Sequence, residues 1–203
     1  MKHSRFCSIL AVAVLVAGVL GTTATAQSFV WTSHTPKSPV AGTTDLLKVD
    51  YFSNANTSGA PDGKVRITNP GSPTGNLCAQ IYVFDSYQTM SECCACLVTP
   101  SGMRKLSVNN DLTANPLTGI KLTDGTVSIV AGFTNNNKCS PLNDIVSPTL
   151  RAWGTHIDDT FAITETEYSD RALGQWDDYL LSGCYAISLD GSGHGICSCG
   201  IGD

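Results

Sequence analysis

The sequence predicts a mainly β protein: an antiparallel β-sandwich-like domain with one short C-terminal helix and a disulfide-stapled tail. Three observations support this prediction. Short runs rich in β-branched and aromatic residues follow one another from residue 46, separated by clusters of Asn, Asp, Gly, Pro and Ser. No helical period interrupts them before residue 170, and eight of the nine cysteines lie after residue 77. Strands at this spacing without intervening helices favour an antiparallel sandwich or barrel.

Seven runs are expected to be strands because their residues alternate in polarity or favour extended backbone. The strongest is Ala79–Phe84, which is rich in Ile, Tyr, Val and Phe. An eighth short strand is expected at Tyr185–Leu189, and residues 28–32 form either a strand or part of a loose arm. The seven are Leu46–Phe52, Lys64–Thr68, Ala79–Phe84, Gly102–Val108, Gly125–Phe133, Leu150–Ile157 and Thr160–Tyr168.

One segment, Asp170–Leu181, has the pattern of an amphipathic helix. Ser169 or Asp170 is expected to cap its start, and Gly183 is expected to end it. Its tryptophan is expected to pack against the sheet. The apolar positions follow the spacing i, i+3, i+7, i+8 at Leu173, Trp176, Leu180 and Leu181.

The N-terminus has the three parts of a secretory signal peptide. Lys2, His3 and Arg5 precede the apolar run Ile9–Leu20, and Ala24-Thr25-Ala26 forms a cleavage pattern. The apolar run is shorter than the about 20 residues of a membrane span. We therefore expect a signal peptide over residues 1–26, an N-terminal arm over 27–44 and a single β-rich domain over 45–203. The protein is expected to be secreted or periplasmic.

The charge of the chain bears on its partners. The formal net charge is −5, and loss of Lys2 and Arg5 with the signal peptide would make it two units more negative. Nucleic acids and anionic lipid surfaces need a basic partner, so neither is expected. The rest of the sequence contains no second apolar run long enough to span a bilayer, so membrane insertion of the mature chain is not expected. Self-association and a surface ligand both stay open.

The cysteines are expected to form disulfides, since an exported chain with an even number of thiols favours oxidation. Cys93 and Cys94 are adjacent, and a bridge between neighbours would strain the peptide, so each is expected to have a different partner. On a strand, Cys94 and Cys96 share one face. The C-terminal pair is expected to be stapled back to this central cluster, with 105 connectivities open. The expected set is Cys78, Cys93, Cys94, Cys96, Cys139, Cys184, Cys197 and Cys199.

Other chemistry has weaker support in the sequence. A metal site that combines thiolates with His194 is disfavoured, because the spacing does not match zinc motifs and oxidation consumes thiols. Asp190-Gly191-Ser192-Gly193-His194 gathers triad residue types too closely along the chain for a hydrolytic triad. His156 is expected on the solvent face of a strand, and no catalytic residue or resident cofactor is expected.

Acidic pairs occur at Asp158-Asp159, Glu165/Glu167 and Asp177-Asp178. Glu165 and Glu167 are two residues apart on an expected strand and therefore share a face. Such a pair could hold calcium or act as a glycosidase pair, but a solvated strand face is the favoured interpretation. Calcium is left open as a ligand.

Several segments together resemble a family of small secreted, cysteine-rich bacterial proteins. The resemblance covers most of the mature chain. It implies export and a β-rich fold; because the family has no established activity, it implies no catalytic residue. The segments are 62–71 (DGKVRITNPG), 76–100 (NLCAQIYVFDSYQTMSECCACLVTP), 106–119 (LSVNNDLTANPLTG), 164–168 (TETEY) and 191–203 (GSGHGICSCGIGD).

The favoured function is a secreted structural, adhesive or binding protein without enzymatic activity. The first alternative is an extracellular module that binds glycan or calcium through loop carboxylates and aromatic side chains such as Trp31, Trp153 and Tyr179. The second is a secreted hydrolase with an unrecognised site. A histidine and a carboxylate within hydrogen-bond reach in a concave pocket would favour the hydrolase. A flat, aromatic-lined groove would favour the binding module.

Overall fold

A computed structural model describes residues 46–71, 75–142, 146, 150–174, 176–190 and 197–199. The chain divides into two units, Met1–Ser33 and His34–Asp203, and all described residues belong to the second. The expected signal peptide, the arm and the glycine-rich part of the tail lie outside the described residues. So do Trp31, His34, His194 and the side chains of Trp176 and Asp177.

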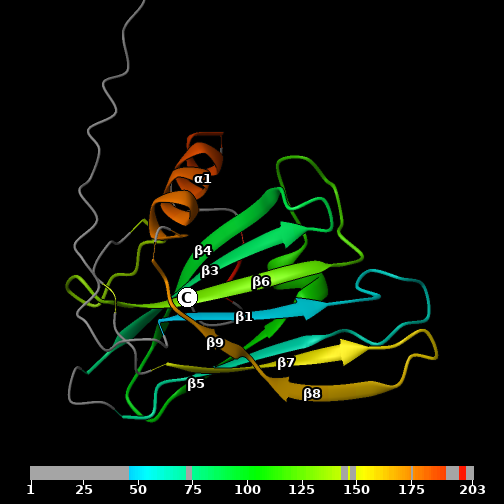
Figure 1. Cartoon of the computed structure of the whole chain (residues 1–203), viewed down its shortest axis with the longest axis horizontal. Coiled ribbons are helices and arrows are strands. Elements are labelled where there is room, and N and C mark those ends of the chain that lie inside the picture. The colour runs from blue at the N-terminus through cyan, green and yellow to red at the C-terminus, as the bar shows by residue number, and fades with distance from the viewer. Residues whose placement is uncertain are drawn as a thin grey trace, which may run out of the picture. The chain divides into compact units, whose positions relative to one another are not determined.

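The described residues form two antiparallel sheets, as predicted (Figure 1). The five-stranded sheet has the order β4-β3-β6-β1-β9, and the four-stranded sheet has the order β5-β2-β7-β8. The strands of the first are β4 (Met90–Val98), β3 (Leu77–Asp85), β6 (Gly125–Phe133), β1 (Leu47–Phe52) and β9 (Ser169–Arg171). Those of the second are β5 (Met103–Ser107), β2 (Lys64–Thr68), β7 (Arg151–Ile157) and β8 (Ile163–Glu167).

The main core lies between the two sheets. Side chains alternate along each strand, so one set from each sheet meets the other sheet. Strand β2 shows this plainly: Val65 and Ile67 are buried, whereas their neighbours are only half-buried. The sheets contribute Phe52, Ile81, Val127 and Ile129 on one side and Val65, Ile67, Leu106 and Ala152 on the other.

A second core lies on the opposite face of the five-stranded sheet, where helix α1 (Trp176–Asp190) packs beside β4 (Figure 1). Leu180, Cys184 and Ser188 are buried at the spacing i, i+4, i+8, which is one face of a helix. Leu180 and Cys184 join Tyr82, Cys93 and others in this core. Because both faces of this sheet are covered, eight of the nine residues of β3 are buried.

The helix is present, but its predicted bounds were wrong. Residues 169–171 form strand β9 and pair with β1, so neither Ser169 nor Asp170 begins a helix. Gly174, which has a φ of 52°, separates this strand from α1. The helix then continues through Gly183 to Asp190, and the predicted strand at 185–189 is helical. Tertiary contacts with β1 and the disulfide at Cys184 override the local signals.

Two other predicted features needed correction. Strand β4 was absent from the predicted set; its cysteines and Glu92 do not give an alternating polarity, because both of its faces are covered. The predicted strand at 160–168 begins later, since Asp158 accepts hydrogen bonds from the backbone of Thr160 and Ala162 and closes a turn. A single π-helical turn, η1 (Val108–Leu112), follows β5 directly.

Candidate functional site

The outer face of the four-stranded sheet carries a row of polar and aromatic side chains across all four strands. Strand register places Lys105 opposite Arg66, Arg66 opposite Trp153, and Trp153 opposite Glu167. These residues alternate with the inward-facing Val65, Leu106 and Ala152, so they share the face away from the core. The row therefore sets a tryptophan at the centre of an open sheet face. We call this surface the Trp153 face.

The charges around Trp153 are arranged in pairs. Arg66 forms an ion pair with Glu165, and the Nη1 of Arg151 lies 3.1 Å from the Oε1 of Glu167. Glu165 and Glu167 share a face, as predicted, and all of β8 is exposed. Lys105 on β5 is exposed. Because each glutamate engages a guanidinium, the two carboxylates do not converge on a common point as calcium ligands would.

The indole of Trp153 is half-buried, which fixes its position while leaving part of its surface accessible. Guanidinium and carboxylate groups beside it can donate and accept hydrogen bonds with a ligand lying on the ring. An aromatic body with polar groups at its rim is the usual composition of a site for a ligand that has both apolar and hydroxyl-bearing surfaces. The Trp153 face is therefore suited to binding.

A second polar group lies inside the sandwich, where β1 faces β7 and β8. The Nε2 of His156 is 2.5 Å from the Oγ1 of Thr166 and 3.3 Å from the Oδ2 of Asp50. The Thr166 hydroxyl also lies 3.3 Å from that Asp50 oxygen. The ring of Tyr51 covers the imidazole, with centroids 4.0 Å apart. Burial, and next the Asp50 carboxylate, hold the pKa of Tyr168 well above its ordinary value.

The position of His156 corrects the prediction of a solvent-facing histidine. It alternates with Thr155 so as to share the inward face with Ala152 and Gly154, and it is buried. A catalytic triad uses both ring nitrogens, one toward the acid and one toward the nucleophile. Here Asp50 and Thr166 both lie at Nε2, while Nδ1 is buried and has no hydrogen-bond partner among the residues that the structure describes. This arrangement fixes the ring but does not form a proton relay.

The eight expected cysteines form four disulfides, and the prediction of separate partners for Cys93 and Cys94 is confirmed. Cys93 joins Cys184 of helix α1, and Cys94 joins Cys197. The stapling of the tail to the central cluster is also confirmed. The pairs are Cys78–Cys139, Cys93–Cys184, Cys94–Cys197 and Cys96–Cys199.

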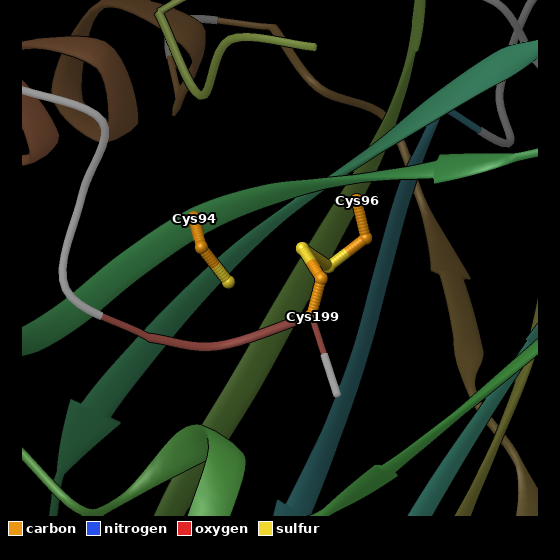
Figure 2. A group of neighbouring side chains, drawn as sticks. All are labelled: Cys94, Cys96 and Cys199. Atoms are coloured by element: carbon orange, nitrogen blue, oxygen red, sulfur yellow. A yellow bond between two sulfur atoms is a disulfide. The ribbon is translucent and has the colours of Figure 1, made fainter. Parts of the chain in front are cut away.

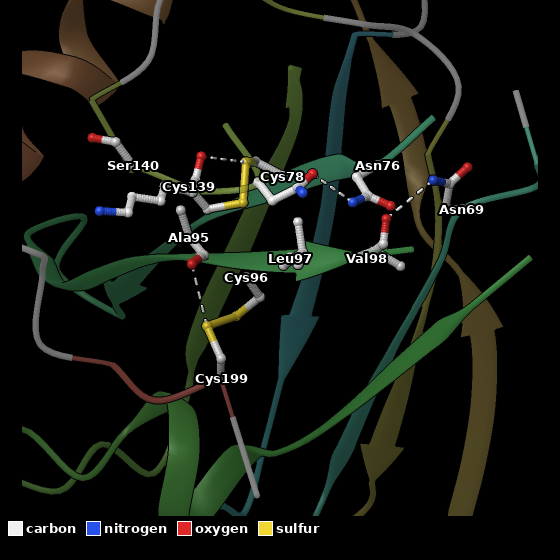
Figure 3. The surroundings of a disulfide bond; sticks show 12 residues. Asn69, Asn76, Cys78, Ala95, Cys96, Leu97, Val98, Cys139, Ser140 and Cys199 are labelled. Carbon is white, nitrogen blue, oxygen red and sulfur yellow. Dashed lines mark hydrogen bonds between the residues drawn. A yellow bond between two sulfur atoms is a disulfide. The ribbon is translucent and has the colours of Figure 1, made fainter. Parts of the chain in front are cut away.

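The two tail bridges place residues 197–199 against the inner core at strand β4. The backbone N–H of Ser198 donates to the carbonyl of Asp111 at 2.9 Å, and the N–H of Cys197 approaches the carbonyl of Cys93. The Sγ of Cys199 lies 3.3 Å from the carbonyl oxygen of Ala95 (Figure 3). The covalent links therefore hold a segment that contributes little apolar surface of its own.

Sequence reasoning did not find Glu92, a buried acid on β4. Its side chain is 1% exposed, and neither carboxyl oxygen has a hydrogen-bond partner among the described residues. Burial raises the pKa of Glu92 to about 8; the nearby backbone of Asn115 acts in the opposite direction, although it does not meet the geometry of a hydrogen bond. Glu92 follows a polar loop and precedes the cysteine cluster, so its neighbours in the sequence do not indicate that it is buried. Its burial follows only from the register of β4 against β3.

A comparison with family models, with curated proteins and with solved structures found no match to this chain. Among the described residues, no helix combines the length and the apolar character needed to cross a bilayer.

Proposed function

We propose that the chain is a secreted, non-enzymatic protein with a structural, adhesive or binding role, and that it binds its ligand through the Trp153 face. The observation that supports this most directly is the row Lys105–Arg66–Trp153–Glu167 on the outer face of the four-stranded sheet. Four disulfides in one small domain suit an oxidising compartment. Membership of the secreted cysteine-rich bacterial family is part of the same proposal.

The ligand class that fits this surface best is a glycan. A sugar ring presents C–H groups that stack on an indole and hydroxyls that hydrogen bond with charged side chains around it. The ion pairs Arg66–Glu165 and Arg151–Glu167 already hold these side chains in place, which lowers the entropy lost on binding. Calcium has less support as a ligand, since both glutamates engage arginines.

Screening the exported protein on an oligosaccharide array, followed by calorimetric titration of the tightest binder, tests this proposal. Trp153→Ala should weaken binding at least 10-fold, and Trp153→Phe should retain part of it. Tyr87→Ala removes an aromatic side chain that is 88% exposed in the β3–β4 turn and should leave the affinity unchanged. Equal affinity of wild type and Trp153→Ala would show that this face is not the site.

The hydrolase alternative depends on His156 and Asp50, whose Nε2 and Oδ2 atoms lie 3.3 Å apart. It has less support because both partners of the imidazole lie at one nitrogen. A His156→Gln variant tests it: loss of any hydrolytic activity found in the exported protein would favour the enzyme over the binding module. The export proposal is tested separately by N-terminal sequencing of the mature protein, which should begin at Gln27.

A further inference from the structure

Two of the four disulfides lie side by side on the inner face of β4. The Sγ atoms of Cys94, Cys96 and Cys199 all lie within 4.8 Å of one another (Figure 2). Cys94 and Cys96 are buried, and Cys199 is half-buried. The remaining sulfur of these two disulfides belongs to Cys197, which is bonded to Cys94. The two bridges have the same spacing on both segments: Cys94 is joined to Cys197, and Cys96, two residues later, is joined to Cys199, also two residues later.

The other two bridges lie apart from this cluster. Cys78 and Cys93 alternate with the core residues Ala79 and Cys94, so both belong to the opposite face of the five-stranded sheet. Among the described residues, the three sulfurs at β4 are the one group of acidic, histidine or cysteine side chains close enough to share an ion. The bridges Cys78–Cys139 and Cys93–Cys184 can therefore serve as controls for substitutions in the sulfur cluster.

We propose that reduction of these two bridges converts the cluster into a thiolate site for a soft metal ion, copper(I) or zinc(II). A dithiol supplies two electrons and two protons to each disulfide and is itself oxidised to a disulfide; a phosphine supplies the two electrons and becomes its oxide, with water providing the two protons and the oxygen. Each protein disulfide becomes two thiols. The metal ion then displaces thiol protons and binds the thiolates. In the oxidised protein every cysteine of the described residues is in a disulfide, so the site is gated by redox state.

The geometry supports this assignment. Zinc–sulfur bonds of about 2.3 Å place the sulfurs of a tetrahedral site roughly 3.8 Å apart. The Sγ of Cys94 lies within 4.8 Å of the Sγ atoms of Cys96 and Cys199, which are bonded to each other until the bridge is reduced. Thiolates select copper(I) and zinc over harder cations. Glu92 lies two residues before Cys94 and therefore on the same face of β4, and its side chain is buried, but its carboxylate is not part of the group of sulfurs that lie within 4.8 Å of one another.

Cadmium titration of the full exported chain tests the inference, because cadmium–thiolate charge transfer absorbs in the ultraviolet. After phosphine reduction and removal of the reductant without oxygen, wild type should bind one ion per chain, and the oxidised protein should bind none. Cys94→Ser/Cys96→Ser should lose at least 10-fold in affinity. Cys78→Ser/Cys139→Ser removes a bridge outside the cluster and should bind like wild type.

A third variant separates a folded site from an unfolded, metal-scavenging chain. Cys197→Ser/Cys199→Ser keeps the Cys93-Cys94-Ala95-Cys96 run but removes the tail thiols, so a folded site should bind at least 10-fold more weakly. Undiminished binding by this variant would overturn the proposal, as would absence of binding by reduced wild type or binding by the oxidised form. Far-UV circular dichroism of each reduced variant monitors the β fold.

Discussion

Strands β4 and β8 both lie at the edge of a sheet, but they are held by different forces. Strand β4 is covered on both faces and carries three of the four disulfides. Strand β8 is exposed along its whole length and has no cysteine; its glutamates form surface ion pairs. Covalent bonds and burial thus secure the β4 edge, whereas the β8 edge depends on interactions that water and salt weaken. The proposed binding surface lies on the β8 side.

The largest expected effect comes from removing both tail bridges. Cys93–Cys184 already closes a long loop beside Cys94, so Cys94–Cys197 adds roughly 3 kcal/mol and Cys96–Cys199 about 2 kcal/mol by loop entropy. Cys197→Ser/Cys199→Ser should therefore lower the free energy of unfolding by roughly 5 kcal/mol. Cys96→Ser/Cys199→Ser removes only the second of these bridges and should lower the free energy of unfolding by about 2 kcal/mol. Denaturant melts measure both, and equal losses would contradict this account of the β4 edge.

Glu92 gives the next effect, and its sign follows from its raised pKa. The carboxyl takes up a proton on folding between its ordinary pKa of 4.5 and about 8. Its contribution is therefore fully present below pH 4.5 and is lost as the pH rises toward 8, at roughly 1.4 kcal/mol per pH unit.

Glu92→Gln, which mimics the neutral acid, should raise stability at pH 8 by a few kcal/mol and flatten the pH dependence. Glu165→Gln on the exposed β8 is the matched control and should change stability by under about 1 kcal/mol. Chemical unfolding at several pH values measures both variants. A Glu92→Gln protein with the wild-type pH profile would show that this acid is ionised in the folded state.

Thr166 tests the one point where β8 reaches the interior. Its hydroxyl contacts His156 and Asp50, so Thr166→Val leaves a buried imidazole with one fewer partner. We expect a loss of about 1–3 kcal/mol. Thr164 shares its face of β8 and makes no side-chain hydrogen bond among the described residues, so Thr164→Val should be nearly neutral. The melting temperatures of the two variants should differ by several degrees. Similar melting temperatures would show that the contacts of the Thr166 hydroxyl with His156 and Asp50 do not stabilise the fold.

The smallest effect is expected from the surface pair Arg151–Glu167. The side chains are 62% and 49% exposed, so solvent screens their attraction. A double-mutant cycle with alanine at both positions should give a coupling energy below about 1 kcal/mol that falls further in high salt. A larger, salt-insensitive coupling would mean that the β8 edge is as firmly held as β4.

Several features could be predicted because their signals are local. Strands β2 and β6 have the predicted bounds, since alternation and flanking turn residues lie within the segments themselves. The disulfide set followed from the cysteines, and the repeated Cys-x-Cys spacing predicted that the tail is stapled to the central cluster. The shared face of Glu165 and Glu167 followed from the strand period alone.

The sequence by itself thus determined the β class, most of the strands and the set of cysteines that form disulfides, because these depend on residue types and short-range spacing; which cysteine pairs with which was decided by the tertiary structure. Only the tertiary structure decided that β4 is covered on both faces, that His156 points inward and that residues 169–171 pair with β1 instead of starting α1. It also decided that Trp153 lies between Arg66 and Glu167. These features depend on strand register and on which strands become neighbours, and those pairings join residues far apart in the chain.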